Sequence, residues 1–312
     1  MRRGPLPVAF AILFALSVGS VFAAPRALAQ TPLPITIGYQ SNVNWLLFVA
    51  RDLKLFEKAG LAPNYVKFVA GAPMIEAAEG KTIDVTDIGI VPFLVGLSKG
   101  VDWTMIGISM EMAYAEGIAV RNDSGIAAFG DLKGKRIGFF KGSTAHYGLM
   151  MALRQQGIRR DQVTLLHMPP AEQLAALANG NIDAAMTWEP WLQRMDHEAK
   201  ARIIATEGDF GIYANVAAFT ARRDWLRENR ETAVRFLQAL LMAYDVMQKD
   251  RGIGIRTLAR EMGIKEAWVQ EIYEEAPPPN MNLWADPSYR YSLVEGSGLH
   301  RRLEYVATFL FK

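Results

Sequence analysis

Two stretches of this sequence pass through the same features in the same order. Residues 58–85 read KAGLAPNYVKFVAGAPMIEAAEGKTIDV, and residues 155–184 read QQGIRRDQVTLLHMPPAEQLAALANGNIDA. Each runs from a helix end through a glycine, a strand, a short turn, a second helix and another glycine to an Ile-Asp pair. The repeat predicts two similar lobes built from one strand–helix module.

The two copies differ in spacing at one place. Gly80 stands three residues before its Ile-Asp pair, whereas Gly180 stands two residues before the equivalent pair. We expect the extra residue to shift the turn before Asp84. Asp84 and Asp183 hold equivalent positions, and we interpret them as structural carboxylates that tie a loop, because the spacing does not place two carboxylates on one reacting bond.

The alternation of strands and helices extends outward from the repeat. It predicts a mostly parallel α/β architecture in which helices cover the sheets. Strands are expected at 34–39, 64–71, 82–89, 134–140, 161–168 and 181–190, and helices at 44–60, 73–79, 91–100, 142–157 and 169–180. After about residue 215 the sequence becomes helical and amphipathic, with helices expected within 221–250, 263–276 and 300–310.

The first 29 residues have the pattern of a secretory signal. Arg2 and Arg3 precede an uncharged apolar run at 8–22, and the Ala-Leu-Ala at 27–29 predicts cleavage before Gln30. A membrane anchor is disfavoured because the run is shorter than the roughly 18 apolar residues that a spanning helix needs. Removal of three basic residues would change the formal charge from +2 to −1, which disfavours nucleic acid as a partner.

The sequence contains no cysteine and four histidines. It therefore has no disulfide, thiolate metal site, cysteine nucleophile or lipid-modified cysteine. The histidines show no metal-ligand spacing, so neither a metal nor a cofactor is expected. Together with the signal pattern, this predicts an exported protein that is free in a Gram-negative periplasm.

Residues 139–151, FFKGSTAHYGLMM, indicate a site for an anion at the start of a helix. Gly142 allows close backbone approach, Ser143 is a good helix cap, and the N–H groups of Thr144, Ala145 and His146 point out of the first turn. The alternative is that Ser143 only caps its own helix. Similar helix starts after Asn42, Gly71 and Gly89 favour the anion site, because strand ends that feed helices form the ligand edge of an open sheet.

Two further signals have both a structural and a functional interpretation. His146 is expected to be neutral and to pack or donate to a ligand, rather than to act as a base. In TWEPW, residues 187–191, Trp188 is expected in a pocket wall and Glu189 beside a ligand amine. The alternative for Glu189 is that it caps a helix that begins at Pro190. No nucleophile motif is present, so no catalytic residue is predicted.

As a set, these motifs resemble a known family. GSTAHY at a helix start, PPAEQ, GNIDA and WEP, with LFEKAGL and GIVP earlier in the chain, are similar to the periplasmic solute-binding proteins of ABC importers for taurine, alkanesulfonates and nitrate. The resemblance implies a type II, two-lobed fold that captures its ligand by hinge closure. It also implies an ABC permease and its ATPase as partners, and a monomer is expected.

The resemblance further implies lobe boundaries and a pocket. Lobe 1 would comprise 30–118 and 218–312, and lobe 2 would comprise 119–217, with crossover strands near 117–121 and 215–220. The predicted ligand-binding residues lie at strand ends and helix starts, and none is an arginine, so helix N-termini would hold the anion. They are Gln40, Asn42, Trp45, Gly71, Ala72, Gly89, Ile90, Gly142, Ser143, Thr144, His146, Trp188 and Glu189.

The sequence leaves the ligand open. A small sulfonate, taurine or nitrate is the first expectation, and a pyrimidine thiamine precursor or an aromatic acid is the alternative. An enzyme of the same fold, such as a thiamine-pyrimidine synthase, is disfavoured because its cysteine-rich motif is missing. A sensory ligand-binding protein is the remaining alternative.

Overall fold

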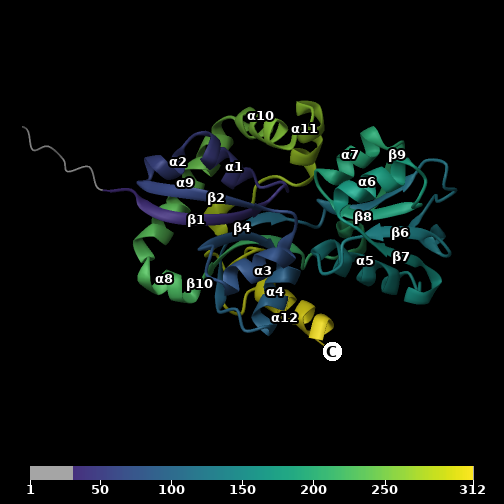
Figure 1. Cartoon of the computed structure of the whole chain (residues 1–312), viewed down its shortest axis with the longest axis horizontal. Helices are drawn as coiled ribbons and strands as arrows, with labels where there is room; N and C mark the ends of the chain where they lie inside the picture. The colour runs from purple at the N-terminus through teal and green to yellow at the C-terminus, as the bar shows by residue number, and fades with distance from the viewer. Residues whose placement is uncertain (1–30, 312) are drawn as a thin grey trace, which may run out of the picture. The chain divides into compact units, whose positions relative to one another are not determined.

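Two five-stranded sheets organise residues 31–311, the part of the chain that the computed structural model describes (Figure 1). The first sheet has the strand order β2-β1-β3-β10-β4, and the second has the order β7-β6-β8-β5-β9. The predicted signal segment, residues 1–29, lies outside the described residues. The strands are β1 Leu33–Gln40, β2 Leu61–Phe68, β3 Val85–Gly89, β4 Trp103–Glu111, β5 Glu116–Arg121, β6 Arg136–Phe139, β7 Thr164–His167, β8 Ala184–Trp188, β9 Ala201–Thr206 and β10 Val216–Arg222.

The two sheets share one topology, as the sequence repeat predicts. In the first sheet β1 is parallel to β2 and β3, whereas β10 is antiparallel to β3 and β4. In the second sheet β6 is parallel to β7 and β8, whereas β5 is antiparallel to β8 and β9. Four strands of each sheet therefore run in one direction and one runs against them, which confirms the mostly parallel two-lobed α/β fold.

The antiparallel strand of each sheet follows a passage of the chain from the other sheet. After β4 the chain leaves the first sheet through residues 112–115 and forms β5 in the second. After β9 it returns through residues 207–215 and forms β10 in the first. The predicted crossover strands at 117–121 and 215–220 therefore pair within a single sheet, and the chain changes sheet just before each of them.

Asp84 and Asp183 make the same contact in the two sheets. Asp84 Oδ2 accepts the backbone N–H of Thr36 at 2.8 Å, and Asp183 Oδ2 accepts that of Arg136 at 2.9 Å. The backbone of each aspartate donates in return to the carbonyl of the same residue. Each carboxylate therefore fastens the turn before one strand, β3 or β8, to the neighbouring parallel strand, β1 or β6, in agreement with their structural interpretation.

The turn before Asp84 is not shifted, contrary to expectation. Lys81 adopts the left-handed conformation, with φ 57°, at the position where Gly180 has φ 73° in the second copy. Gly80 thus corresponds to Asn179, and each is the C-cap of its helix. A lysine in the left-handed region replaces the expected glycine, so the two turns have equal length.

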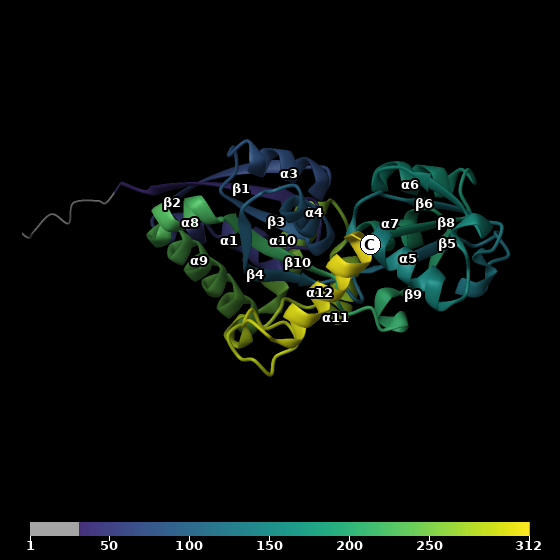
Figure 2. The same cartoon turned by 90° about the horizontal axis from the view of Figure 1, so that it is seen from below.

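Helices cover both sheets (Figures 1 and 2). The expected helix at 44–60 is broken at Lys54, which has φ 54°. Leu55 and Phe56, which follow the break, are both buried, and Phe56 stacks on Phe236 of α9 (Arg230–Lys249) with ring centroids 5.5 Å apart. The strands β4 and β9 and the helix α10 (Arg251–Met262) were not expected from the sequence, and α7 (Trp191–Glu198) was considered only as the structural alternative for Glu189. The helices of eight residues or more are α1 Trp45–Asp52, α3 Gly71–Glu79, α4 Ile90–Ser98, α5 Thr144–Gln155, α6 Pro170–Ala178, α7 Trp191–Glu198, α9 Arg230–Lys249, α10 Arg251–Met262, α11 Glu266–Glu275 and α12 Gly298–Phe311.

Candidate functional site

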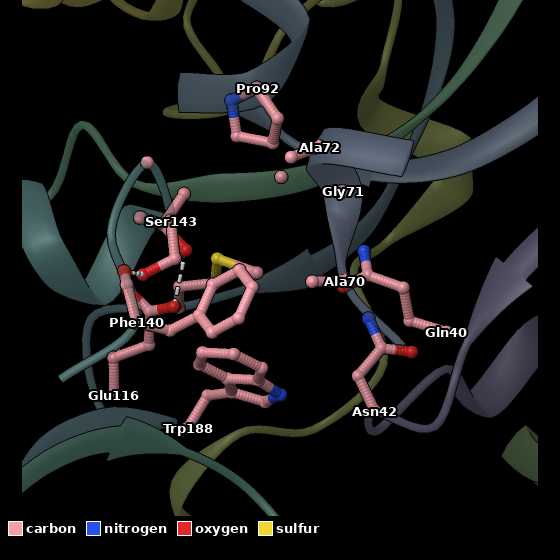
Figure 3. A pocket seen from close by; sticks show the side chains of 14 residues that line it. Gln40, Asn42, Ala70, Gly71, Ala72, Pro92, Glu116, Phe140, Ser143 and Trp188 are labelled. Atoms are coloured by element: carbon pink, nitrogen blue, oxygen red, sulfur yellow. Dashed lines mark hydrogen bonds between the residues drawn. The ribbon is translucent and has the colours of Figure 1, made fainter. Parts of the chain in front are cut away.

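A pocket of about 390 Å³, including its opening to solvent, lies between residues of the two sheets (Figure 3). Residues at or just after the carboxyl ends of β1, β2, β3, β6 and β8 form much of its wall, which is the edge where open α/β sheets bind ligands. The lining residues are Gln40, Asn42, Ala70, Gly71, Ala72, Gly89, Pro92, Met112, Glu116, Phe140, Gly142, Ser143, Thr144 and Trp188.

Three helices begin at this pocket. Gly71 opens α3, Gly89 is the N-cap of α4, and Thr144 opens α5. Among the described residues, the backbone N–H groups of Gly71, Ala72 and Thr144 have no hydrogen-bond acceptor. Free N–H groups and the positive ends of helix dipoles make this wall favourable for an anion.

Ser143 both caps α5 and lines the pocket. Its Oγ accepts the backbone N–H of His146 at 3.1 Å and donates to the Phe140 carbonyl at 2.8 Å. The sequence left open whether Ser143 caps its helix or faces a ligand site. The cap is present, and it fixes the loop that leads into the helix start at the pocket.

Two glycines allow the helix starts to approach one another. A Cβ atom on Gly71 would lie 2.5 Å from Pro92 Cγ. A Cβ on Gly89 would lie 3.0 Å from Cγ2 of Thr144, which belongs to the lobe of the second sheet. The close contact between the starts of α4 and α5 across the pocket therefore depends on the missing side chain of Gly89.

Part of the pocket wall is apolar and aromatic. Trp188 and Phe140 meet edge to face with ring centroids 6.4 Å apart, and Figure 3 shows both rings on the same side of the pocket. Met112 and Pro92 add further apolar surface. Such a wall suits the organic part of a ligand whose charged end is held by N–H groups.

Among the described residues, the pocket wall has no basic side chain, and it contains an acidic residue that was not predicted from the sequence. Glu116 is completely buried, and Thr144 Oγ1 donates a hydrogen bond to its Oε1. Burial raises the pKa of Glu116 to about 7. The sequence signal was a glutamate at the head of the apolar strand EGIAV, which was considered only as a crossover.

Nine of the thirteen predicted residues line the pocket. Asn42 lines the pocket, but it does not stand at the helix start as expected. The N-cap of α1 is Asn44, whose Oδ1 accepts the Leu47 N–H at 3.0 Å. Asn42 is almost fully buried, and its Oδ1 has no partner among the described residues. The nine are Gln40, Asn42, Gly71, Ala72, Gly89, Gly142, Ser143, Thr144 and Trp188.

Trp45 and Ile90 were predicted at the pocket but belong to the core. Both are fully buried, and Trp45 Nε1 donates to the Ala276 carbonyl at 2.9 Å. Trp45 also meets Tyr273 edge to face at 5.1 Å. Both residues lie in the first turn of a helix whose apolar face points into the lobe. Their backbones are therefore close to a strand end, but their side chains are buried in the core and do not reach the pocket.

His146 and Glu189 are also absent from the pocket wall. The His146 ring lies on Phe139 at 4.8 Å, and its Nδ1 accepts the Gly142 N–H at 3.3 Å; burial lowers its pKa, so the ring is neutral. Glu189 Oε2 accepts the N–H of Gln193 at 3.2 Å, which makes it a cap of α7. Both side chains thus serve local structure, and for Glu189 the helix-cap alternative was correct.

The geometry defines a class: a protein with the two-lobed α/β binding-protein fold, in which three helices begin at a pocket between the lobes. Within that class, the chain belongs to the NMT1-like family, whose model matches residues 29–253. Among the described residues, no cluster of potential metal ligands is present, and no helix has the length and apolar character needed to cross a bilayer.

Known relatives of the chain include proteins named for binding sulfonates. It is 28% identical to an aliphatic sulfonates-binding protein of Escherichia coli (strain K12), with 88% of this chain and 85% of the relative covered. It is 25% identical to the taurine-binding periplasmic protein of the same organism, over 74% of each chain. The alkanesulfonate-binding protein from Xanthomonas axonopodis pv. citri, solved bound to MOPS, shares its fold with a TM-score of 0.73, 27% identity and coverage of 90% and 95%. These relatives are binding proteins rather than enzymes.

Proposed function

We propose that this protein captures a small organic sulfonate in the pocket between its lobes and delivers it to an ABC importer. The observation that carries the proposal is the meeting of three helix starts, from both lobes, at one pocket. Their free N–H groups supply directional donors for sulfonate oxygens without a formal positive charge.

The apolar wall favours an organic sulfonate over nitrate. Trp188 and Phe140 offer aromatic surface beside the helix starts, and nitrate has no carbon to place against it. The relatives named for aliphatic sulfonates, taurine and alkanesulfonate support the same ligand class. Capture would occur by closure of the lobes about the segments 112–115 and 207–215, and the lobe boundaries at 118 and 217 remain a prediction.

The location and partners belong to the same proposal. Export through a signal cut before Gln30 would place the protein in the periplasm, and one relative carries that location in its name. There it would act as a monomer that docks on an ABC permease, with the ATPase on the other side of the membrane.

A thermal-shift screen of residues 30–312 tests this function. The panel contains ethanesulfonate, taurine, MOPS, nitrate, acetate and a pyrimidine, with sodium chloride at equal ionic strength as the control. A sulfonate at about one hundred times its Kd stabilises the folded state by roughly 2.7 kcal/mol, which should raise Tm by about 5 °C for a chain of this size. A shift with the pyrimidine alone, or with none of the anions, would contradict the proposal.

A further inference from the structure

Two buried carboxyl groups lie where the chain passes between the sheets. Glu116 follows the first passage, and Glu207 follows β9 at the start of the second; both are almost completely buried. Asn215, the last residue before β10, lies between them. Its Nδ2 is 2.9 and 2.8 Å from the two Glu207 carboxylate oxygens and 3.4 Å from Glu116 Oε2.

Helix α5 of the second lobe packs directly against this pair of carboxyl groups. A Cβ atom on Gly148 of α5 would lie 1.7 Å from Glu207 Oε1, so the glycine leaves room for the carboxyl group. Thr144, one turn earlier on α5, donates its hydroxyl to Glu116 and accepts Asn215 Nδ2 at its carbonyl at 3.2 Å. Thr144 therefore contacts the pair while its backbone N–H group has no acceptor among the described residues.

The pair has no cation to balance it among the described residues. Its hydrogen-bond partners are an amide and a hydroxyl, and neither glutamate makes a salt bridge with a lysine, arginine or histidine. Two buried carboxylates without a cation are costly, so the pair retains at least one proton. Burial raises the pKa of Glu116 to about 7, and burial together with Glu116 raises that of Glu207 well above its usual range.

An anion at the start of α5 would lie beside this pair, because Glu116 and Thr144 line the same pocket. A negative charge there disfavours ionisation of Glu116 further. We propose that Glu116 and Glu207 form a proton-holding pair, and that capture of an anion above neutral pH is accompanied by uptake of a proton by this pair. The inference rests on the proposed function, because it concerns the anion that the pocket captures.

The other titratable groups near Glu116 and Glu207 either lie away from the pair or change their charge outside the pH range in which Glu116 titrates. On α5, His146 is already neutral near pH 7, and Tyr147, which faces Glu207, has its pKa raised to about 12. Asp209, two residues after Glu207, is exposed and accepts the Thr206 N–H at 2.7 Å. Burial raises the pKa of Glu189 to about 8, close to that of Glu116. Glu189 does not line the pocket, and its charged neighbours are Glu275, Glu271 and Asp196, so it serves as a matched control for a buried glutamate outside the pair.

The test is calorimetric titration of residues 30–312 with ethanesulfonate, which stays a monoanion, between pH 5.5 and 9 in buffers of different ionisation enthalpy. We expect Kd to be constant below about pH 7 and to rise by up to about tenfold per pH unit above it, with uptake approaching one proton per ligand. Glu116→Gln should give a Kd independent of pH, whereas Glu189→Gln should retain the wild-type slope.

A wild-type Kd that does not change with pH, with no dependence on the buffer, would overturn the inference and leave the proposed function standing. A slope that persists in Glu116→Gln would also overturn it. If that variant does not fold, Glu207→Gln takes its place, and the wild-type profile remains decisive. Absence of binding at every pH would refute the proposed function, and the inference with it.

Discussion

The approach of α4 and α5 across the pocket predicts a strong effect of Gly89→Ala on ligand binding. The added Cβ would lie 3.0 Å from Thr144 Cγ2, whereas carbon atoms in ordinary contact are about 3.5–4.0 Å apart. Thr144 is buried and its hydroxyl is held by Glu116, so the helix starts must separate. Overpacking of this kind costs about 1–3 kcal/mol, which corresponds to a Kd about 5- to 160-fold higher.

The assay is calorimetric titration of ethanesulfonate, together with thermal unfolding of the ligand-free protein. Gly130→Ala is the matched control, because a Cβ on Gly130 meets no atom within 4 Å. We expect the control to bind as the wild type does, and Gly89→Ala to lose affinity while its ligand-free Tm changes little, because separation of the lobes relieves the contact. Wild-type affinity in Gly89→Ala would refute the requirement that the two helix starts meet around the ligand.

Three further predictions concern stability and the contact between lobes. Burial raises the pKa of Glu189 to about 8 against an ordinary 4.5, so the folded state keeps a proton that the unfolded chain has lost. The stability that this group contributes is therefore complete below about pH 4.5 and falls by about 1.4 kcal/mol per pH unit up to about pH 8; in urea titrations Glu189→Gln should remove that fall. Asp183→Ala should destabilise the protein by about 3 kcal/mol and Asp84→Ala by about half as much, because Asp183 accepts hydrogen bonds from the Arg136 guanidinium group at 3.0 and 2.8 Å, whereas the guanidinium group of Arg222 comes only within 3.8 Å of Asp84. Trp268→Ala removes a parallel stack on His197, with centroids 4.4 Å apart, between α11 and α7 of the other lobe, and should weaken ethanesulfonate binding about fivefold.

Each of these has a clear contrary result. An unchanged pH profile of stability in Glu189→Gln would mean that the carboxyl group is ionised in the folded protein. Equal losses for the two aspartate variants would show that the side chain of Arg136 adds nothing to the contact with Asp183. Undiminished affinity in Trp268→Ala would show that the stack on His197 is not coupled to capture.

The repeat made the architecture predictable from the sequence. Local periodicity located most strands and helices, and the equivalence of Asp84 and Asp183 indicated their shared structural contact. The turn before Asp84 was predicted wrongly because glycine was taken as the marker of the left-handed residue. Lys81 adopts that conformation instead, and a sequence pattern does not show which residue of a turn has the positive φ angle.

The backbone part of the pocket was also predictable. Gly71, Gly89 and Ser143 mark helix starts that follow strand ends, and the topology brings those starts together. The direction of individual side chains was harder to predict. Trp45 and Ile90 point into the core because tertiary packing, rather than position in the helix, decides which face is buried.

Glu116 was missed because it arrives from a different part of the topology. It opens the antiparallel strand β5, directly after the chain changes sheet, and no motif of the repeat contains it. Its partners Glu207 and Asn215 are distant in sequence and meet it only through the return passage of the chain. Such a cluster depends on long-range contacts that a single sequence does not display.

A crystal structure of residues 30–312 with ethanesulfonate would test the central claim most directly. We predict sulfonate oxygens within about 2.7–3.2 Å of the backbone N–H groups of Gly71, Ala72 and Thr144, with the ethyl group against Trp188. A sulfonate bound outside this pocket, or held there by an arginine or lysine side chain in place of the helix starts, would contradict the account.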